Sequence, residues 1–276
     1  DPDVEEDKPP RADADNLLDR LLYEGVLPRY AFPTDVATFH IFDKEKSSSF
    51  RHKDAYSPSQ GLPVALSQYA PGKQVWVGGK CYVSGAIYSR SGPERIAAWD
   101  NRELYYECSV CRFAETRKGD DNSGSSSKCP ACGTRGTFEL KGPWMRPVGF
   151  AHPVDVREET SPDRVPEISY ATRAKLTTKT PGSERKWADA NPRFVGLPDR
   201  THLLVSNVGP KGNGYRYCVS CGRIEAMTEP LSAITGAHLV PYPTKPGQES
   251  CRGRSTQHDV VLGTRFVTDI ALFSLR

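Results

Sequence analysis

Eight cysteines are the residues of this chain of 276 amino acids whose chemistry is easiest to infer. Four of them form two Cys-x-x-Cys pairs, Cys108/Cys111 and Cys129/Cys132, separated by 17 residues. Each Cys-x-x-Cys turn directs two thiolates at one point, and two such turns complete a tetrahedral site suited to Zn²⁺. All four ligand positions are thiolates, so none is left for water. The spacing therefore predicts a structural zinc ribbon in preference to a redox dithiol.

A second, less regular cluster follows near the C-terminal end of the sequence. It has one Cys-x-x-Cys pair, Cys218/Cys221, and Cys251 is the only cysteine after it. His238 lies between the pair and Cys251, so these three cysteines and His238 are the preferred ligand set for a second Zn²⁺. His258 is an alternative fourth ligand. Two ordinary buried cysteines beside an unrelated histidine would also give this pattern.

The remaining cysteine and histidine residues indicate no further metal or catalytic site. Cys81 has no partner at metal-ligand spacing and is expected to be a buried strand residue. His152 and the pair His258-Asp259 have no nucleophile or second acid nearby at informative spacing, so core or loop histidines are expected. The sequence contains no phosphate-binding loop, dinucleotide fingerprint, metalloprotease motif or nucleophile elbow. We therefore expect no ATPase or other catalytic activity. A zinc hydrolase is a third alternative function, and it would require three protein ligands and a water at the second site.

Basic residues accompany the predicted ribbon, although the net charge of the whole chain is only +3. Residues 141–276 hold 19 Lys and Arg against 13 Asp and Glu, a local balance of +6, which is compatible with nucleic acid or with an ordinary solvated surface. The candidate contacts to DNA phosphates are Arg112, Arg117, Lys118, Lys128 and Arg135. Such contacts would not depend on base sequence. The alternative is a ribbon that docks a partner protein and touches no DNA.

Hydropathy and turn signals predict a β-rich α+β fold, a small sheet or barrel with an inserted zinc ribbon and a second C-terminal zinc knuckle. A short helix is expected from Asp15 to Gly25, a strand over 36–42, a polar loop over 43–61 and a helical turn over 62–72. Gly78-Gly79 predicts a hairpin joining 74–77 to 80–88. The expected regions are a disordered acidic linker (1–14), an N-terminal α+β region (15–104), the zinc ribbon (105–136), a loop-rich connection (137–199) and a zinc-binding region (200–276).

The cellular setting is expected to be the cytoplasm. Mean hydropathy is −0.57, and no apolar run approaches the roughly 20 residues that a membrane helix needs. The sequence shows no charged-then-apolar leader of the kind that directs secretion. In a reducing compartment, paired Cys-x-x-Cys motifs indicate a metal site in preference to a disulfide. The first residue is Asp, and the last strand-like stretch has no closing turn, so we expect a piece of a longer polypeptide.

Five short stretches are informative when taken together: 27–33, 68–72, 147–150, the knuckle Cys218 to Gly222, and 262–269. They resemble the region after the motor in bacterial DEAD/DEAH-box helicases, and the helicase-partner subunit of DISARM-type anti-phage defence. A more distant comparison is the zinc module of Mrf-type DNA-repair helicases. The resemblance implies a segment that acts with a DEAD/DEAH-type motor, in cis or in trans, with zinc sites that hold the fold. The repair helicases have four cysteines in that module, whereas this chain has three there.

Overall fold

The computed structural model describes residues 35–119, 128–160, 170–172, 174–176, 188–191, 194–227, 234 and 236–275. The chain divides into two units, residues 1–36 and 37–276, and nearly all described residues belong to the second. The acidic linker over 1–14 and the helix expected from Asp15 lie outside the described residues. In the part that is described, strands predominate and helices are few, which confirms the β-rich α+β class.

A five-stranded sheet is built around β1 (Val36–Phe42), the strand predicted over the same residues. β1 pairs in parallel with β10 (Phe150–Ala151), which pairs with β6 (Ala86–Ile87). Two short strands, β2 (Asp54–Tyr56) and β3 (Ser59–Gly61), also pair with β1. The prediction of an uninterrupted loop over 43–61 is therefore wrong for these residues. Their side chains are polar or exposed, so backbone pairing to β1 decides their conformation and hydropathy does not reveal it.

The hairpin predicted at Gly78-Gly79 is present as β4 (Gln74–Val77) and β5 (Lys80–Val83). Both glycines have positive φ, 60° and 76°, as a two-residue hairpin turn requires. The second strand ends at Val83, five residues earlier than predicted, and β6 then joins the five-stranded sheet. Before the hairpin, α2 (Leu62–Gln68) confirms the predicted helical turn.

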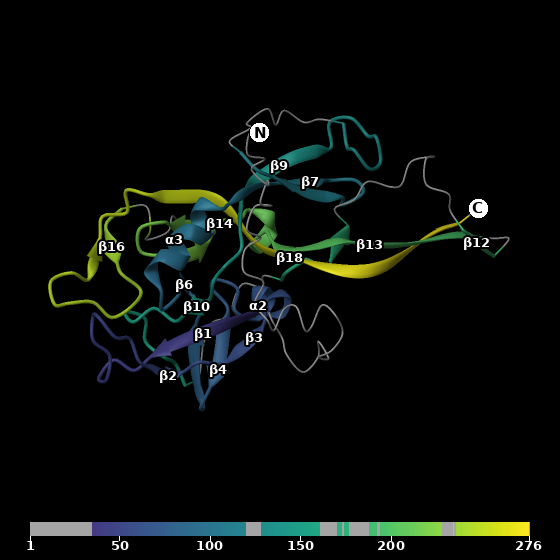
Figure 1. Ribbon diagram of the computed structural model, residues 1–276. Helices are drawn as coiled ribbons and strands as arrows, with labels where there is room; N and C mark the ends of the chain where they lie inside the picture. Colours follow the sequence, from purple (N-terminus) through teal and green to yellow (C-terminus); the bar gives the residue numbers. More distant parts are fainter. Residues whose placement is uncertain are drawn as a thin grey trace, which may run out of the picture. The chain divides into compact units, whose positions relative to one another are not determined.

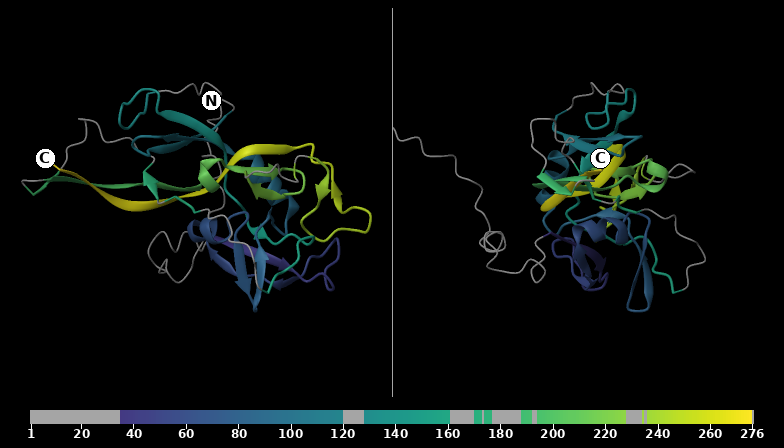
Figure 2. Two further views of the ribbon diagram at one scale, coloured as in Figure 1. Left: turned by 180° about the vertical axis from the view of Figure 1, so that it is seen from behind. Right: turned by 90° about the vertical axis from the view of Figure 1, so that its right-hand side faces the viewer.

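A nine-stranded sheet holds Cys108 of the first cysteine cluster and Cys218 of the second. Its longest pair is β13 (Phe194–Asn207) and β18 (Thr256–Leu275), which run antiparallel side by side (Figure 1, Figure 2). β18 also pairs with β9 (Phe138–Met145) and with β14 (Tyr215–Cys218). The other members are β7 (Glu103–Cys108), β8 (Ala114–Arg117), β11 (Lys175–Leu176), β12 (Ala188–Asn191) and β15 (Ile224–Ala226). One strand thus connects the ribbon strands to the strand that leads into the second knuckle.

The remaining elements lie around the second cluster. β16 (His238–Leu239) and β17 (Ser250–Cys251) form a separate two-stranded ladder, and η1 (Pro210–Gly212) precedes β14. A helix that the sequence analysis did not predict, α3 (Gly92–Asp100), buries Arg95 and Trp99. No helix among the described residues is long and apolar enough to cross a membrane.

The main core lies between α2, the five-stranded sheet and the strands β14 and β18. Its largest side chains are aromatic and fully buried, and each contributes roughly 1.5–3 kcal/mol of apolar burial; they include Phe39, Phe150, Tyr215 and Tyr217. A smaller apolar cluster, with Tyr106, Phe113 and Phe138, packs under the ribbon beside Cys108 and Cys129. The first cysteine cluster therefore has its own small core.

Candidate metal centres

The two pairs Cys108/Cys111 and Cys129/Cys132 meet in one cluster whose sulfur atoms all lie within 4.8 Å of one another. The Cys108 and Cys132 Sγ atoms are 3.8 Å apart, and the Cys111 and Cys129 Sγ atoms are 3.6 Å apart. A tetrahedron with Zn–S bonds of about 2.3 Å has edges of about 3.8 Å, whereas a disulfide joins sulfurs at about 2.0 Å. The geometry therefore suits a four-coordinate metal ion.

The second cluster brings together Cys218, Cys221, His238 and Cys251, again with ligand atoms within 4.8 Å. The Cys218 and Cys251 Sγ atoms are 3.7 Å apart, and the Cys221 Sγ lies 3.2 Å from His238 Nε2. His238 and Cys251 are direct partners in the β16–β17 ladder. His238 Nδ1 donates to the Gly236 carbonyl at 2.7 Å, which leaves the Nε2 lone pair facing the thiols. This is how a histidine ligand is usually oriented.

All three Cys-x-x-Cys turns are closed by the same backbone hydrogen bond, from the amide of the residue after the second cysteine to the carbonyl of the first cysteine. The bonds are Arg112 to Cys108 at 3.0 Å, Gly133 to Cys129 at 2.9 Å and Gly222 to Cys218 at 2.7 Å. The three donor residues have positive φ, 62°, 74° and 83° in that order. The third knuckle therefore has the same backbone as the two knuckles of the ribbon.

Glycine is required at the third of these positions for a second reason. A Cβ atom on Gly222 would lie 2.4 Å from the Ile87 carbonyl oxygen. The Ile87 amide in turn donates to the Gly222 carbonyl at 2.8 Å. The knuckle is thereby held against the end of β6, and a larger residue would push it away.

Hydrogen bonds favour the thiolate form of Cys108 and Cys132 in the first cluster and of Cys218 in the second. Burial alone would raise the pKa of Cys108, but hydrogen bonds from the Thr137 hydroxyl and the Cys111 amide lower that pKa to about 6. Hydrogen bonding from the Cys221 thiol lowers the pKa of Cys218 to about 4. Metal ligation needs deprotonated sulfur, whereas burial raises the pKa of Cys111 and the Cys218 sulfur raises that of Cys221, so metal binding would have to release protons from these two thiols.

Arg95 on α3 is a site residue that the sequence analysis missed. Its buried guanidinium donates to the carbonyls of Val219 and Ser220, the two residues inside the knuckle, the second at 2.8 Å. It also donates to the Tyr217 hydroxyl at 3.3 Å. The signal for α3 was present, because Ser91 precedes Gly92-Pro93-Glu94, a helix start with proline in the first turn.

The other histidines and the isolated cysteine lie outside both clusters. His258 is exposed on β18 and accepts a hydrogen bond from Arg216 Nε at 3.2 Å. Cys81 is buried in β5, as expected. His152 is buried, with Nδ1 accepting from the Val83 amide at 3.1 Å and Nε2 3.2 Å from the Val156 carbonyl. The structure therefore places His238, and not His258, with the cysteines.

The five basic residues predicted to touch DNA fall into two groups. Arg117 is half-buried, lies 4.5 Å over the Tyr106 ring and pairs with Glu115 at 2.6 Å. Arg112 lies 3.5 Å from Glu107. The other three are exposed and make no ion pair with the part of the chain that is described: Lys118, Lys128 and Arg135. Among the described residues of the ribbon, these three are the predicted DNA contacts without an acidic partner.

Comparison with known proteins gives one informative similarity. The chain is 29% identical over 274 residues to Druantia protein DruE of Escherichia coli (strain UMEA 4076-1). The similarity points to an anti-phage defence family. It covers 95% of this chain but only 14% of the length of that protein. No family model and no solved structure matches the chain. The resemblance to a helicase post-motor region stays a prediction.

Proposed function

We propose that this chain is a non-catalytic, zinc-stabilised module of an anti-phage defence system, and that its ribbon contacts the DNA backbone. The similarity to DruE over nearly the whole chain supports the defence role. Because that similarity covers a small fraction of DruE, the motor expected to act with this module is part of the proposal as well. The resemblance of the sequence to regions that accompany DEAD/DEAH-type helicases supports such a partner.

The arrangement of the two clusters supports zinc with a structural role. Each cluster offers four ligands, either four thiolates or three thiolates and one imidazole, and both sets suit tetrahedral Zn²⁺. With four protein ligands, neither centre keeps a position for a reacting water. Zinc would then fix the loops between the strands and leave the chemistry to another part of the system.

The DNA proposal rests mainly on three basic residues of the ribbon that make no ion pair with the described residues. Lys118 follows β8, whereas Lys128 and Arg135 flank the second ribbon knuckle. They are spread over exposed turns and do not place two donors together for one base edge. Contacts to phosphates therefore fit them better than recognition of bases. Neutralising phosphates releases counterions, which makes such binding sensitive to salt.

The test is the salt dependence of duplex DNA binding by the purified chain. The logarithm of affinity is expected to fall with the logarithm of salt concentration by about 0.9 per phosphate contact. Reversing Lys118 and Arg135 together to Glu should weaken binding to all sequences alike and flatten the slope by up to about two units. As a matched control, the same reversal at the exposed Arg252 and Arg254 should leave the slope unchanged.

A docking role for the same ribbon is the second candidate, and one observation favours it. Val110, inside the first knuckle, is 62% exposed, which is unusual for a large apolar side chain in a tight turn. Two results together would favour docking over the DNA proposal. The affinity for DNA would not depend on salt, and Val110→Ser would lose a helicase motor in a pull-down.

A further inference from the structure

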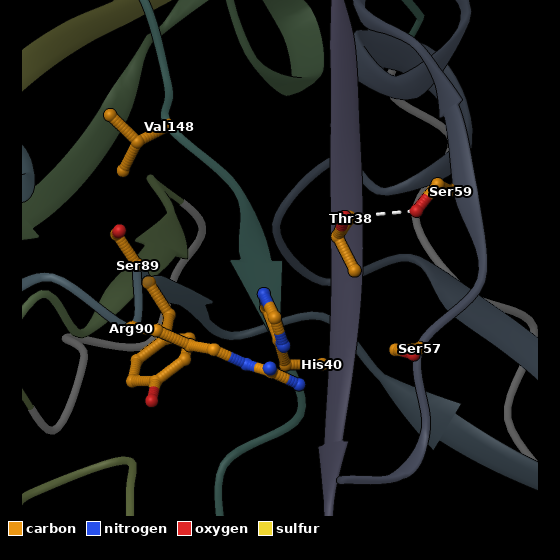
Figure 3. A pocket seen from close by; sticks show the side chains of 8 residues that line it. Thr38, His40, Ser57, Ser59, Ser89, Arg90 and Val148 are labelled. Carbon is orange, nitrogen blue, oxygen red and sulfur yellow. Dashed lines mark hydrogen bonds between the residues drawn. The ribbon is translucent and has the colours of Figure 1, made fainter. Parts of the chain in front are cut away.

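A polar pocket of about 390 Å³ opens beside β1, and none of its lining residues belongs to either cysteine cluster. Figure 3 shows the hydroxyls of Thr38 and Ser59 joined by a hydrogen bond, 2.9 Å long, with Ser57 close by. The same pocket is lined by His40 and Arg90. Neither the zinc nor the DNA proposal uses any of these residues, so the pocket needs its own explanation.

A buried acid lies behind the pocket and orients its histidine. Asp54 Oδ2 accepts a hydrogen bond from His40 Nδ1 at 3.0 Å, and the side chains of Asp54 and His40 are only 6% and 10% exposed. The bond to an acid puts a proton on Nδ1, so the other ring nitrogen, Nε2, is the atom left for a ligand. Nε2 makes no hydrogen bond to the described residues.

Arg90 shares the same carboxylate oxygen but keeps most of its donors. Its Nη2 lies 2.6 Å from Asp54 Oδ2, while the Arg90 side chain is 66% exposed. A guanidinium has five N–H donors, so the bond to Asp54 leaves the others for a bound anion. Asp54 Oδ1 is buried and has no hydrogen-bond partner among the described residues. Burying an incompletely paired carboxylate costs stability, and in this place the carboxylate orients both His40 and Arg90.

We propose that this pocket binds a phosphate group through the free N–H groups of Arg90, the hydroxyls of Ser57 and Ser59, and His40 Nε2. The charges of Arg90 and Asp54 cancel each other. The positive charge that balances the phosphate therefore comes from His40 when it takes up a proton. In the free protein, burial lowers the pKa of His40, against the opposing effect of Asp54. The other ionisable groups around the imidazole are Arg90, Tyr88 and His52. Phosphate binding should therefore raise the pKa of His40.

The experiment uses the full chain and inorganic phosphate, with chloride at equal ionic strength as the reference. NMR of the His40 ring should show a saturable shift with phosphate and a higher His40 pKa when phosphate is bound. Changing Arg90 to Gln should weaken binding by about tenfold or more, since a charge-assisted hydrogen bond is lost. Arg51→Gln is the matched control, because Arg51 is exposed on the neighbouring loop outside the lining.

The source of the phosphate is resolved by adding a thymidine oligonucleotide. Displacement of inorganic phosphate by the oligonucleotide would assign the pocket to nucleic acid, and no displacement would assign it to a small phosphorylated molecule. The proposal is overturned if phosphate gives no saturable His40 shift, or if Arg90→Gln and Arg51→Gln weaken binding equally. The result is independent of the ribbon, whose DNA contacts are tested by Lys118 and Arg135.

Discussion

At the scale of single residues, His238 is oriented as a metal ligand must be. A histidine that is only packed in the core does not need this orientation. The Gly236 carbonyl holds its Nδ1 proton, and its Nε2 faces the Cys221 sulfur. His258 is exposed, and its Nδ1 is already occupied by Arg216. The sequence alone left open which of the two histidines is the fourth ligand of the second cluster. The hydrogen bonds of the two rings favour His238.

We predict that His238→Ala removes one metal ion per chain and that His258→Ala removes none. His238→Cys should retain metal, because a fourth thiolate also completes a tetrahedral zinc site. The measurement is elemental analysis of the purified variants beside the unmodified chain. Metal loss confined to His258→Ala would show that the fourth ligand is assigned wrongly.

The cysteine spacing was enough to predict the first cluster but not to choose the fourth ligand of the second. Two Cys-x-x-Cys pairs constrain each other, whereas His238 and Cys251 meet only because β16 pairs with β17 across an intervening loop. Two-residue strands have no detectable periodicity, so sequence alone could not show this pairing. The buried Asp54–His40 pair was missed for a related reason, since β2 is three residues long and polar.

At the scale of elements, α3 supports the second knuckle from outside. Arg95 is buried on this helix and donates to both carbonyls inside the Cys218-x-x-Cys221 turn. The two hydrogen bonds hold the backbone of the turn against α3, although Ser220 itself is exposed. The helix itself was overlooked because its apolar face is narrow: Ile96 is 50% exposed, while Trp99 is 6% exposed.

Changing Arg95 to Met should destabilise the second centre selectively. The substitution keeps an apolar stem but removes hydrogen bonds to carbonyls, each worth about 1.5–3 kcal/mol when the donor is charged. We expect a loss of about 2 kcal/mol or more in unfolding free energy and weaker binding of the second metal, with the first unaffected. Chelator competition measures both metals separately. Arg102→Met is the control, since Arg102 stacks on Trp99 at 4.8 Å and does not touch the knuckle. Equal effects of the two variants would contradict the role given to Arg95.

At the scale of the whole molecule, β18 links the two proposed zinc centres. It pairs with β9, which returns from the ribbon, and with β14, which ends at Cys218. The β-rich class and the ribbon strands were predictable from alternation and turn residues. The pairing partners of β18 were not, because contacts between strands far apart in sequence leave no local pattern. Each centre should nevertheless fold around its own metal, since each has its own cluster of buried residues.

The most direct measurement is the number of zinc ions per folded chain, determined by native mass spectrometry of the purified protein and two variants. We predict two zinc ions in the unmodified chain and one in each of Cys129→Ser and Cys218→Ser. Structural zinc contributes on the order of 10 kcal/mol to the folding of small zinc domains, so each variant should also lose order around its own centre. A folded chain without zinc, or either variant retaining both ions, would contradict the assignment of these clusters as structural zinc sites.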